Sequence, residues 1–189
     1  CDSYFKTSKN SIITEIKRYK HTFLDGGIES KSLISYQKIL RLIIENRIPK
    51  DGVLIAIGGG VIGDLVAFLA NTYQRGIDLV HIPTTTTAMI DSSIGGKTGI
   101  NFSDQVNLIG TYHNPKAIFI DLDFINTLDD RDYYAGICEA IKMSITSDLE
   151  MFNRLFLLSN KIKNKDINTL EELVYWSILT KLKHVGDDP

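Results

Sequence analysis

Residues 53–64 read VLIAIGGGVIGD, and this stretch decides the fold class. The apolar run from Val53 to Ile57 has the length and composition of a strand that is covered on both faces. Three glycines interrupt the run, and residues 61–73 then have the composition of a buried helix. A strand, a glycine turn and a helix in this order are typical of the start of a βαβ unit.

The alternation of strands and helices continues on both sides of this unit. Residues 31–46 place apolar side chains on one side of a helix, and a helical pattern also runs over residues 8–21. Residues 77–82 and 117–120 are short apolar strands, whereas residues 84–93 fit either a loop or a short helix. The pattern predicts an α/β fold with a doubly wound parallel sheet.

From about residue 129 the pattern becomes helical, with predicted helices over residues 131–145, 149–158 and 170–185. We therefore expect two domains: an N-terminal α/β domain over residues 1–126 and the start of an all-helical domain over residues 127–189. The chain begins with Cys1 in place of Met. This favours a piece of a longer protein that is incomplete at both ends, and a processed chain is the alternative.

Composition excludes several classes of protein. The 189 residues are 43% apolar, which is enough for one core and a second small lobe. Twenty-one basic and 23 acidic side chains leave a net charge of -2, so a nucleic-acid or anionic-membrane surface is not expected. No apolar run is long enough to span a bilayer. Two cysteines cannot build a disulfide framework, which favours a reducing cytoplasm.

The glycine turn is a candidate dinucleotide site. Gly58, Gly60 and Gly63 match the G-x-G-x-x-G pattern between a strand and a helix. Backbone N–H groups without neighbouring Cβ atoms can approach a pyrophosphate, and the helix N-terminus favours its charge. Asp64 suits that terminus or could hold a ribose hydroxyl. The acid expected about 20 residues later is missing, so a purely structural turn explains the glycines equally well.

Two further motifs are ambiguous by themselves. Residues 91–98 read DSSIGGKT, but a phosphate-binding P-loop needs glycine where Asp91 stands. Lys97 could still bind a phosphate or carboxylate, and a solvated lysine on a hairpin is the simpler interpretation. The threonines of residues 84–87 could bind a ligand or cap the next segment.

The candidate acid–base and metal-binding residues also have simpler structural interpretations. None of the four histidines is paired with another at helical ligand spacing, so no complete zinc site is visible. Glu139 and Lys142 share a face of a predicted helix, where a surface ion pair is the simpler interpretation. His81 is most simply a core or rim histidine, and Cys138 is most simply buried.

Taken in order, these segments resemble the 3-dehydroquinate synthase family, with its sugar-phosphate cyclase relatives. Six motifs carry the resemblance: GGGVIGD at 58–64, QRG at 74–76, IPTT at 82–85, IDSSIGGKT at 90–98, NLIG at 107–110 and AGICEAIK at 135–142. Each motif is modest alone, but six in the right order are highly specific. The resemblance weakens back to Gly26 and onward to Pro189.

The resemblance implies a phosphate lyase of the shikimate pathway that works in the cytoplasm. The enzyme would cyclise DAHP, a seven-carbon keto sugar acid phosphate, to 3-dehydroquinate with tightly held NAD and a divalent metal, zinc or cobalt. An alcohol is oxidised, phosphate is eliminated, the ketone is reduced again, and the opened ring closes to a carbocycle. Oxidation comes first because a ketone acidifies the neighbouring C–H. NAD is regenerated in each turnover.

The resemblance also implies the site residues. Those for substrate and catalysis are Asp91, Lys97, Asn107, Lys142 and Arg75. Arg75 would reach the substrate of a neighbouring subunit in a homodimer. The metal ligand would be Glu139. The cofactor contacts would be Gly60, Val61, Ile62, Gly63, Asp64, Thr84, Thr85, Lys97, Phe124, Thr127 and Lys31. We expect Asp91, Lys97, Asn107, Glu139 and Lys142 to converge on one cleft beside a bound dinucleotide.

The chain departs from the family pattern in two places. Val106 stands where the family has a lysine that contacts the cofactor, which leaves open a related cyclase that acts on another heptose phosphate. The family's two histidine metal ligands lie beyond Pro189, so we expect the isolated chain to be inactive and to bind metal weakly. A non-catalytic NAD-binding remnant and a metal-dependent alcohol dehydrogenase are the alternatives, and residues 91–97 favour the cyclase.

Overall fold

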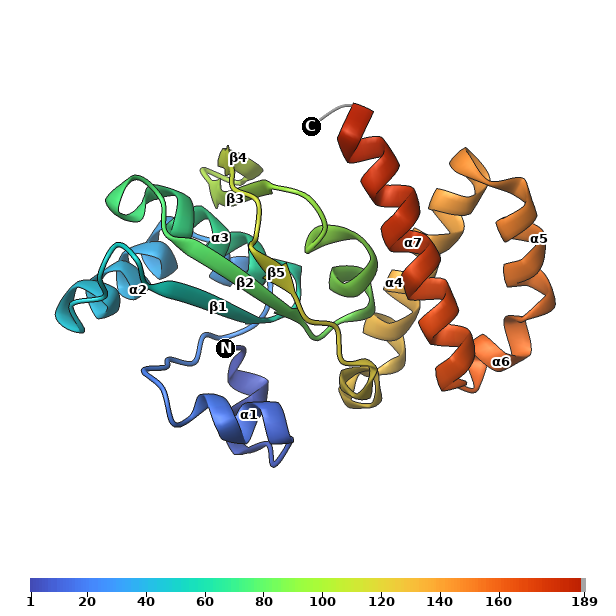
Figure 1. Ribbon diagram of the computed structural model, residues 1–189, viewed down its shortest axis with the longest axis horizontal. Coiled ribbons are helices and arrows are strands. Elements are labelled where there is room, and N and C mark those ends of the chain that lie inside the picture. The colour runs from blue at the N-terminus through green and yellow to red at the C-terminus, as the bar shows by residue number, and fades with distance from the viewer. Residues whose placement is uncertain (188–189) are drawn as a thin grey trace. The chain divides into compact units, whose positions relative to one another are not determined.

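The computed structural model describes residues 1–187 (Figure 1). The chain forms two compact units, one built from residues 1–83 and 96–119, the other from residues 84–95 and the chain from Ile120 onward. These units differ from the predicted domains, whose boundary was placed at residues 126 and 127. The segment 84–95 belongs to the second unit, where its residues 88–92 contact the C-terminal helices.

A parallel sheet forms the centre of the first unit. Its strands are β1 (Val53–Gly58), β2 (Asp78–Pro83) and β5 (Ala117–Ile118), in the order β1-β2-β5. Both pairings are parallel, with Val53 beside Asp78 and Val80 beside Ala117. Helix α3 (Gly60–Thr72) connects β1 to β2. This arrangement confirms the predicted α/β class, although β5 is shorter than the expected strand over 117–120.

Helix α3 is the core element of this unit. Ile62, Leu65 and Leu69 are at most 1% exposed and pack with Ala56 and Leu79 of the sheet. Helix α2 (Leu33–Glu45) joins the same cluster through its buried apolar stripe, as its periodicity predicted. Burial of this stripe is the main source of stability for an amphipathic helix.

The prediction that β1 is covered on both faces is wrong for its first half. Val53 and Ile55 are 50% and 46% exposed, whereas Ala56 and Ile57 are buried. Successive side chains of a strand point to opposite faces, so Val53 and Ile55 lie opposite Leu54, which packs against the α3 cluster. Among the described residues, nothing buries that opposite face here.

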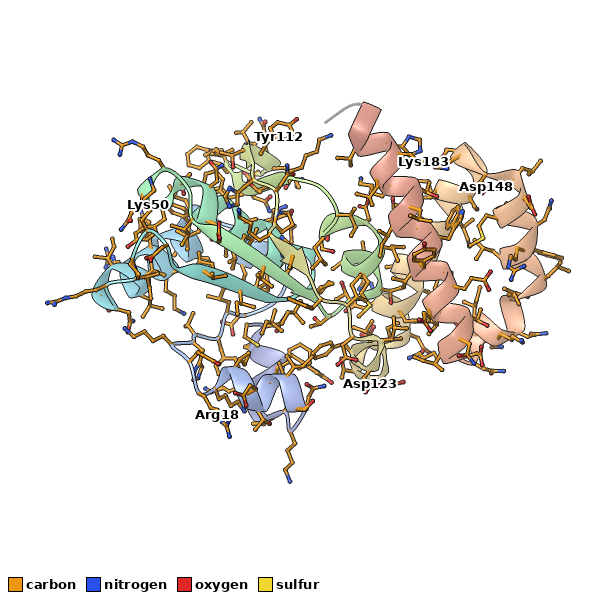
Figure 2. The ribbon with its side chains drawn as sticks, viewed as in Figure 1. Arg18, Lys50, Tyr112, Asp123, Asp148 and Lys183 are labelled. Atoms are coloured by element: carbon orange, nitrogen blue, oxygen red, sulfur yellow. The ribbon has the colours of Figure 1, made fainter. Side chains whose placement is uncertain are left out.

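A β-hairpin completes the first unit, and its two strands were not predicted from the sequence. Strands β3 (Lys97–Phe102) and β4 (Gln105–Tyr112) pair antiparallel. Ser103 and Asp104 form the two-residue turn with φ values of 48° and 61°, as a type I′ turn requires. Ile100 is completely buried and joins the core of α3, which anchors the hairpin base. Tyr112 at the far end of β4 is exposed (Figure 2).

The N-terminal helix is shorter than the pattern over residues 8–21 predicted. A 3-10 helix η1 (Ser3–Thr7) comes before α1 (Ser11–Ile16). Asn10 caps α1, because its side-chain oxygen accepts hydrogen bonds from the Ile12 and Ile13 N–H groups. The short 3-10 helix η2 (Ile28–Ser30) precedes α2, and the short 3-10 helix η3 (Tyr73–Arg75) follows α3.

The second unit is helical. It contains a π-helical turn η4 (Ala88–Ser92), a 3-10 helix η5 (Leu122–Thr127), and the helices α4 (Asp130–Ser147), α5 (Leu149–Leu157), α6 (Ser159–Lys163) and α7 (Ile167–Asp187). The three predicted C-terminal helices are confirmed, and the short α6 was not expected. None of the described helices combines the length and apolarity needed to cross a membrane.

Capping carboxylates explain where these helices begin. Asp129 caps α4, and Asp148, which lies between α4 and α5, caps α5 (Figure 2). Asp148 also accepts a hydrogen bond of 3.2 Å from the Trp176 indole of α7. The bonds from Met151 N–H and Trp176 lower the pKa of the Asp148 carboxyl. One carboxylate therefore starts α5 and ties it to α7.

Helix α4 approaches the η4 segment very closely at Gly136. A Cβ atom at this position would lie 2.6 Å from both Thr86 Cγ2 and the backbone nitrogen of Thr87. Real Cβ atoms are not found this close to a backbone atom, and the backbone cannot rotate away as a side chain can. Glycine at 136 therefore sets the spacing between α4 and η4.

We predict that Gly136→Ala lowers the free energy of unfolding of the second unit by about 2 kcal/mol, because the added methyl overpacks a closed contact. Urea unfolding followed by fluorescence of Trp176 measures this unit, since the chain has a single tryptophan. Gly186→Ala is the matched control in α7, where a Cβ meets nothing within 4 Å. Equal unfolding midpoints for the two variants would contradict the prediction.

Candidate functional site

The glycine turn brings the start of α3 directly over the end of β1. A Cβ on Gly58 would lie 2.8 Å from Ile62 Cβ, so only glycine allows this approach. Gly59 is the N-cap of α3 and has no side chain to cap the first-turn N–H groups. These N–H groups and the helix dipole together form an anion-binding terminus. The geometry fits the pyrophosphate of a dinucleotide.

A buried lysine lies next to this turn. The Lys31 ammonium forms an ion pair with Asp64 Oδ2, just beyond the first turn of α3, and a hydrogen bond to Asn107 Oδ1 on β4. The Lys31 side chain is 6% exposed and that of Asp64 is 22% exposed. Three of the predicted site residues, from three separate segments, are thus in direct contact.

His81 of β2 lies beneath the same turn. Its ring is 3.4 Å from the position that a Cβ on Gly63 would occupy, so Gly63 allows α3 to pack on the imidazole. Burial, with a smaller contribution from the charge of His113, lowers the pKa of His81 to about 4. The expectation of a core histidine is confirmed, since His81 is 7% exposed.

We predict that acid destabilises the first unit through His81. The folded imidazole stays neutral, whereas the unfolded one takes up a proton near pH 6.5. Stability from this group is complete above pH 6.5 and falls by up to about 3 kcal/mol as the pH drops towards 4. His81→Gln should flatten the curve of unfolding free energy against pH over this range, measured by urea unfolding with circular dichroism. A slope that persists in the variant would assign the acid sensitivity to another group.

Two predicted cationic site residues of the first unit are exposed. Lys97 begins β3, and within the described part of the chain no side chain pairs with its ammonium. Arg75 lies in η3, where Gln74 and Arg75 have φ values of 49° and 66°. Consecutive non-glycine residues in the left-handed region are strained, and such strain clusters at functional sites. Because both side chains are exposed, the Lys97 ammonium and the Arg75 guanidinium are accessible to an anionic ligand.

The predicted residues of the second unit form two ion pairs. Glu139 and Lys142 of α4 pair with each other, as the simpler interpretation expected. Asp91 of η4 pairs with Lys181 of α7 at 2.9 Å, with both side chains about one third exposed or less. Lys181 was not singled out from the sequence, because its partner lies 90 positions away and no local motif marks it. The pair places the Lys181 ammonium beside the Asp91 carboxylate.

The other predicted cofactor contacts of the second unit are buried or form hydrogen bonds within that unit. Thr84 is buried, and Thr85 Oγ1 accepts a hydrogen bond of 3.2 Å from Ala88 N–H at the start of η4. The Phe124 side chain is completely buried, and Thr127 Oγ1 donates a 2.6 Å hydrogen bond to the Phe124 carbonyl.

One prediction about α4 is wrong. Cys138 is exposed and not buried. The buried stripe of α4 runs through Gly136, Ile137 and Ala140, and Cys138 lies off that stripe. Its thiol is free.

The described residues do not fit a complete metal site. No three His, Cys, Asp or Glu side chains among them are grouped so that they could hold a metal ion. Glu139, the predicted ligand, is paired with Lys142. A single carboxylate is a weak metal site, because zinc sites use three or four protein ligands.

Comparison with known proteins decides the family. The family described as 3-dehydroquinate synthase N-terminal matches residues 21–135. The chain belongs to the 3-dehydroquinate synthase family. The 3-dehydroquinate synthase of Alkaliphilus oremlandii is 45% identical over 152 residues, which cover 79% of this chain and 42% of the relative. The chain thus spans about half the length of the curated relatives it matches.

Solved structures extend the likeness to other cyclases. ValA, a 2-epi-5-epi-valiolone synthase from Streptomyces hygroscopicus with NAD+ and Zn2+ bound, has a TM-score of 0.90 and 26% identity over 99% of this chain and 54% of its own. A 2-deoxy-scyllo-inosose synthase complexed with carbaglucose-6-phosphate, NAD+ and Co2+ has a TM-score of 0.72 and 25% identity over 87% of this chain and 45% of its own. Iron-containing alcohol dehydrogenases, at 12–16% identity, share the fold alone.

The structure joins some of the predicted site residues and leaves others apart. Lys31, Asp64 and Asn107 are in contact within the first unit, and Asp91, Glu139 and Lys142 belong to the second. The convergence of Asp91, Lys97, Asn107, Glu139 and Lys142 on one cleft involves both units and stays a prediction.

Proposed function

We propose that the chain provides the dinucleotide-binding part, and a portion of the catalytic part, of a 3-dehydroquinate synthase. The observation that carries this proposal is the uncapped N-terminus of α3 over Gly58, with the Lys31–Asp64–Asn107 cluster beside it. NAD, the cofactor bound in the cyclase neighbours, is the proposed ligand. When bound, it supplies a hydride acceptor that returns the hydride within one turnover.

The residues of this chain have distinct proposed roles. Gly60 to Asp64 hold the pyrophosphate and ribose, with Lys31 in the same site and Thr84, Thr85, Phe124 and Thr127 as further cofactor contacts. Lys97 and Asn107, together with Asp91 and Lys142, bind the hydroxyl and acidic groups of the substrate, with Lys97 near the nicotinamide. Support comes from the exposed, unpaired ammonium of Lys97, which can bind a phosphate or carboxylate as a point charge.

Arg75 is the proposed contact with the substrate of a second subunit in a homodimer. Its exposed guanidinium, held on a strained turn, supports this role. Glu139 is the proposed ligand of a divalent metal, zinc or cobalt. Because the described residues do not complete a metal site, we propose no catalytic step through the metal for this chain.

The proposed substrate is DAHP, converted to 3-dehydroquinate in the shikimate pathway of the cytoplasm. The second candidate is a related cyclase that acts on a neutral heptose phosphate. The exposed Val106 on β4, where the family has lysine, favours it. The two candidates differ in whether the substrate carries a carboxylate.

We predict that the chain binds NAD and that Gly60→Val raises the Kd at least about tenfold, because a branched side chain blocks the approach of pyrophosphate to the helix terminus. Isothermal titration with NAD measures both values, and thermal unfolding shows that the variant is folded. Gly186→Ala should leave the Kd unchanged. A wild-type chain that binds no NAD would overturn the proposal.

We predict that the isolated chain releases no phosphate from DAHP above a chelator-treated control, with NAD and Zn2+ or Co2+ supplied.

A chimera in which this chain is followed by the C-terminal remainder of the Alkaliphilus oremlandii enzyme should be active, and Lys97→Met should reduce the rate of the chimera by at least about a hundredfold. Lys38→Met on the exposed face of α2 is the control. Parallel assays with a neutral heptose phosphate decide between the two substrates. Turnover by the isolated chain would contradict the first expectation, and a folded but inactive chimera would contradict the site.

A further inference from the structure

The turn that carries Arg75 has a strained backbone. Gln74 and Arg75 have φ values of 49° and 66°, and the following Gly76 has a φ of 112°. Consecutive non-glycine residues in the left-handed region persist only where the surrounding contacts fix them. Before the turn, the Tyr73 hydroxyl donates a 2.7 Å hydrogen bond to the Ile48 carbonyl. This bond anchors the chain where it enters the turn.

The chain leaves the turn at Ile77, which is buried at 3% exposure. The Ile77 N–H donates a 2.9 Å hydrogen bond to the Ala70 carbonyl, and the Gly76 N–H donates a 2.9 Å bond to the Tyr73 carbonyl. The Ile77 carbonyl oxygen lies 2.9 Å from Nε2 of the His113 ring. Because a carbonyl can only accept, the geometry assigns the proton of this bond to Nε2. Without that donor, a buried carbonyl would lose its partner, which is costly.

His113 is itself fixed at the end of the β3–β4 hairpin. Its N–H donates a 2.7 Å hydrogen bond to the Gly96 carbonyl, next to Lys97. Its ring Nδ1 lies 3.5 Å from Nδ2 of Asn71, which also donates a 3.0 Å hydrogen bond to the Tyr112 carbonyl. A neutral ring with its proton on Nε2 accepts at Nδ1, so both ring nitrogens have a partner. The imidazole therefore links the hairpin to the end of α3 and to the turn that follows it.

We infer that His113 is a positioning residue for Arg75, because its ring holds the carbonyl on the exit side of the strained turn from which the Arg75 side chain extends. Arg75 is exposed, so burial of its own side chain does not fix the turn. The contacts of Tyr73 and Ala70 also hold the turn, and we therefore expect loss of the ring donor to have a local effect. The inference rests on the proposed function, in which Arg75 contacts the substrate of a second subunit.

Nitrogen NMR of the wild-type chain tests the contact without any substitution. The neutral His113 ring should carry its proton on Nε2 and leave Nδ1 bare. A ring with its proton on Nδ1 would have no donor for the Ile77 carbonyl, and this result would overturn the inference.

Hydrogen exchange tests whether the contact holds the turn. In His113→Phe, which keeps a ring but removes the donor, the amides of Gly76 and Ile77 should exchange about tenfold faster or more, while those of β1 stay within about twofold of wild type. His113→Gln should restore most of the protection, because its side-chain amide can donate to the same carbonyl. His21→Phe, at an exposed residue of the same unit, is the matched control.

Three results of this exchange experiment would overturn the inference: unchanged rates in His113→Phe, a uniform rise through the unit, or no difference between His113→Phe and His113→Gln. If His113→Phe does not fold, Asn71→Ala removes the partner of ring Nδ1 and should raise the exchange rates of Gly76 and Ile77. No rise in that variant would count equally against the inference.

A double-mutant cycle tests whether His113 acts through Arg75, with phosphate release by the chimera with the Alkaliphilus oremlandii remainder as the readout. His113→Phe alone should lower kcat/KM about tenfold, but in an Arg75→Gln background it should change kcat/KM by less than about twofold. Effects that multiply would show a role independent of Arg75 and would overturn the inference. If the chimera without substitutions releases no phosphate, the proposed function fails, whereas hydrogen exchange still decides whether His113 holds the turn.

Discussion

Helix α3 begins directly over the end of β1, and this close approach depends on the missing side chain of Gly58. Any Cβ there would strike Ile62, a buried residue in the first turn of α3 itself. The same geometry leaves the first-turn N–H groups of α3 without a side-chain cap. The feature that packs the helix onto the sheet therefore also creates the anion-binding terminus, and the rest of the first unit is arranged around it.

Charged groups in each unit link segments that are distant in sequence. Lys31 connects the start of α2 to α3 and to the β3–β4 hairpin. In the second unit, Asp91 and Lys181 connect η4 to α7. Gly136 brings α4, with Glu139 and Lys142, close to η4. Charged pairs that are partly enclosed add little net stability but require a defined geometry.

Half-buried elements were harder to predict than buried or amphipathic ones. The run that forms α2 has a helical periodicity, and the short apolar run of β1 between a turn and three glycines has the length of a buried strand. The β3–β4 hairpin has an exposed strand and mixed composition, and its turn uses Ser103 and Asp104 at positive φ without the usual glycine. Local patterns also cannot tell which face of a strand stays open, as the exposed Val53 and Ile55 show.

The sequence alone determined the family, the α/β class and the glycine turn, because these depend on ordered local motifs whose spacing is visible along the chain. Tertiary structure decided that Lys31 reaches Asp64 and Asn107, that Lys181 pairs with Asp91, and that residues 84–95 pack with the C-terminal helices. These are contacts between residues tens of positions apart. Only the packed chain brings such residues together, because loop closure and burial, and not local propensity, select them.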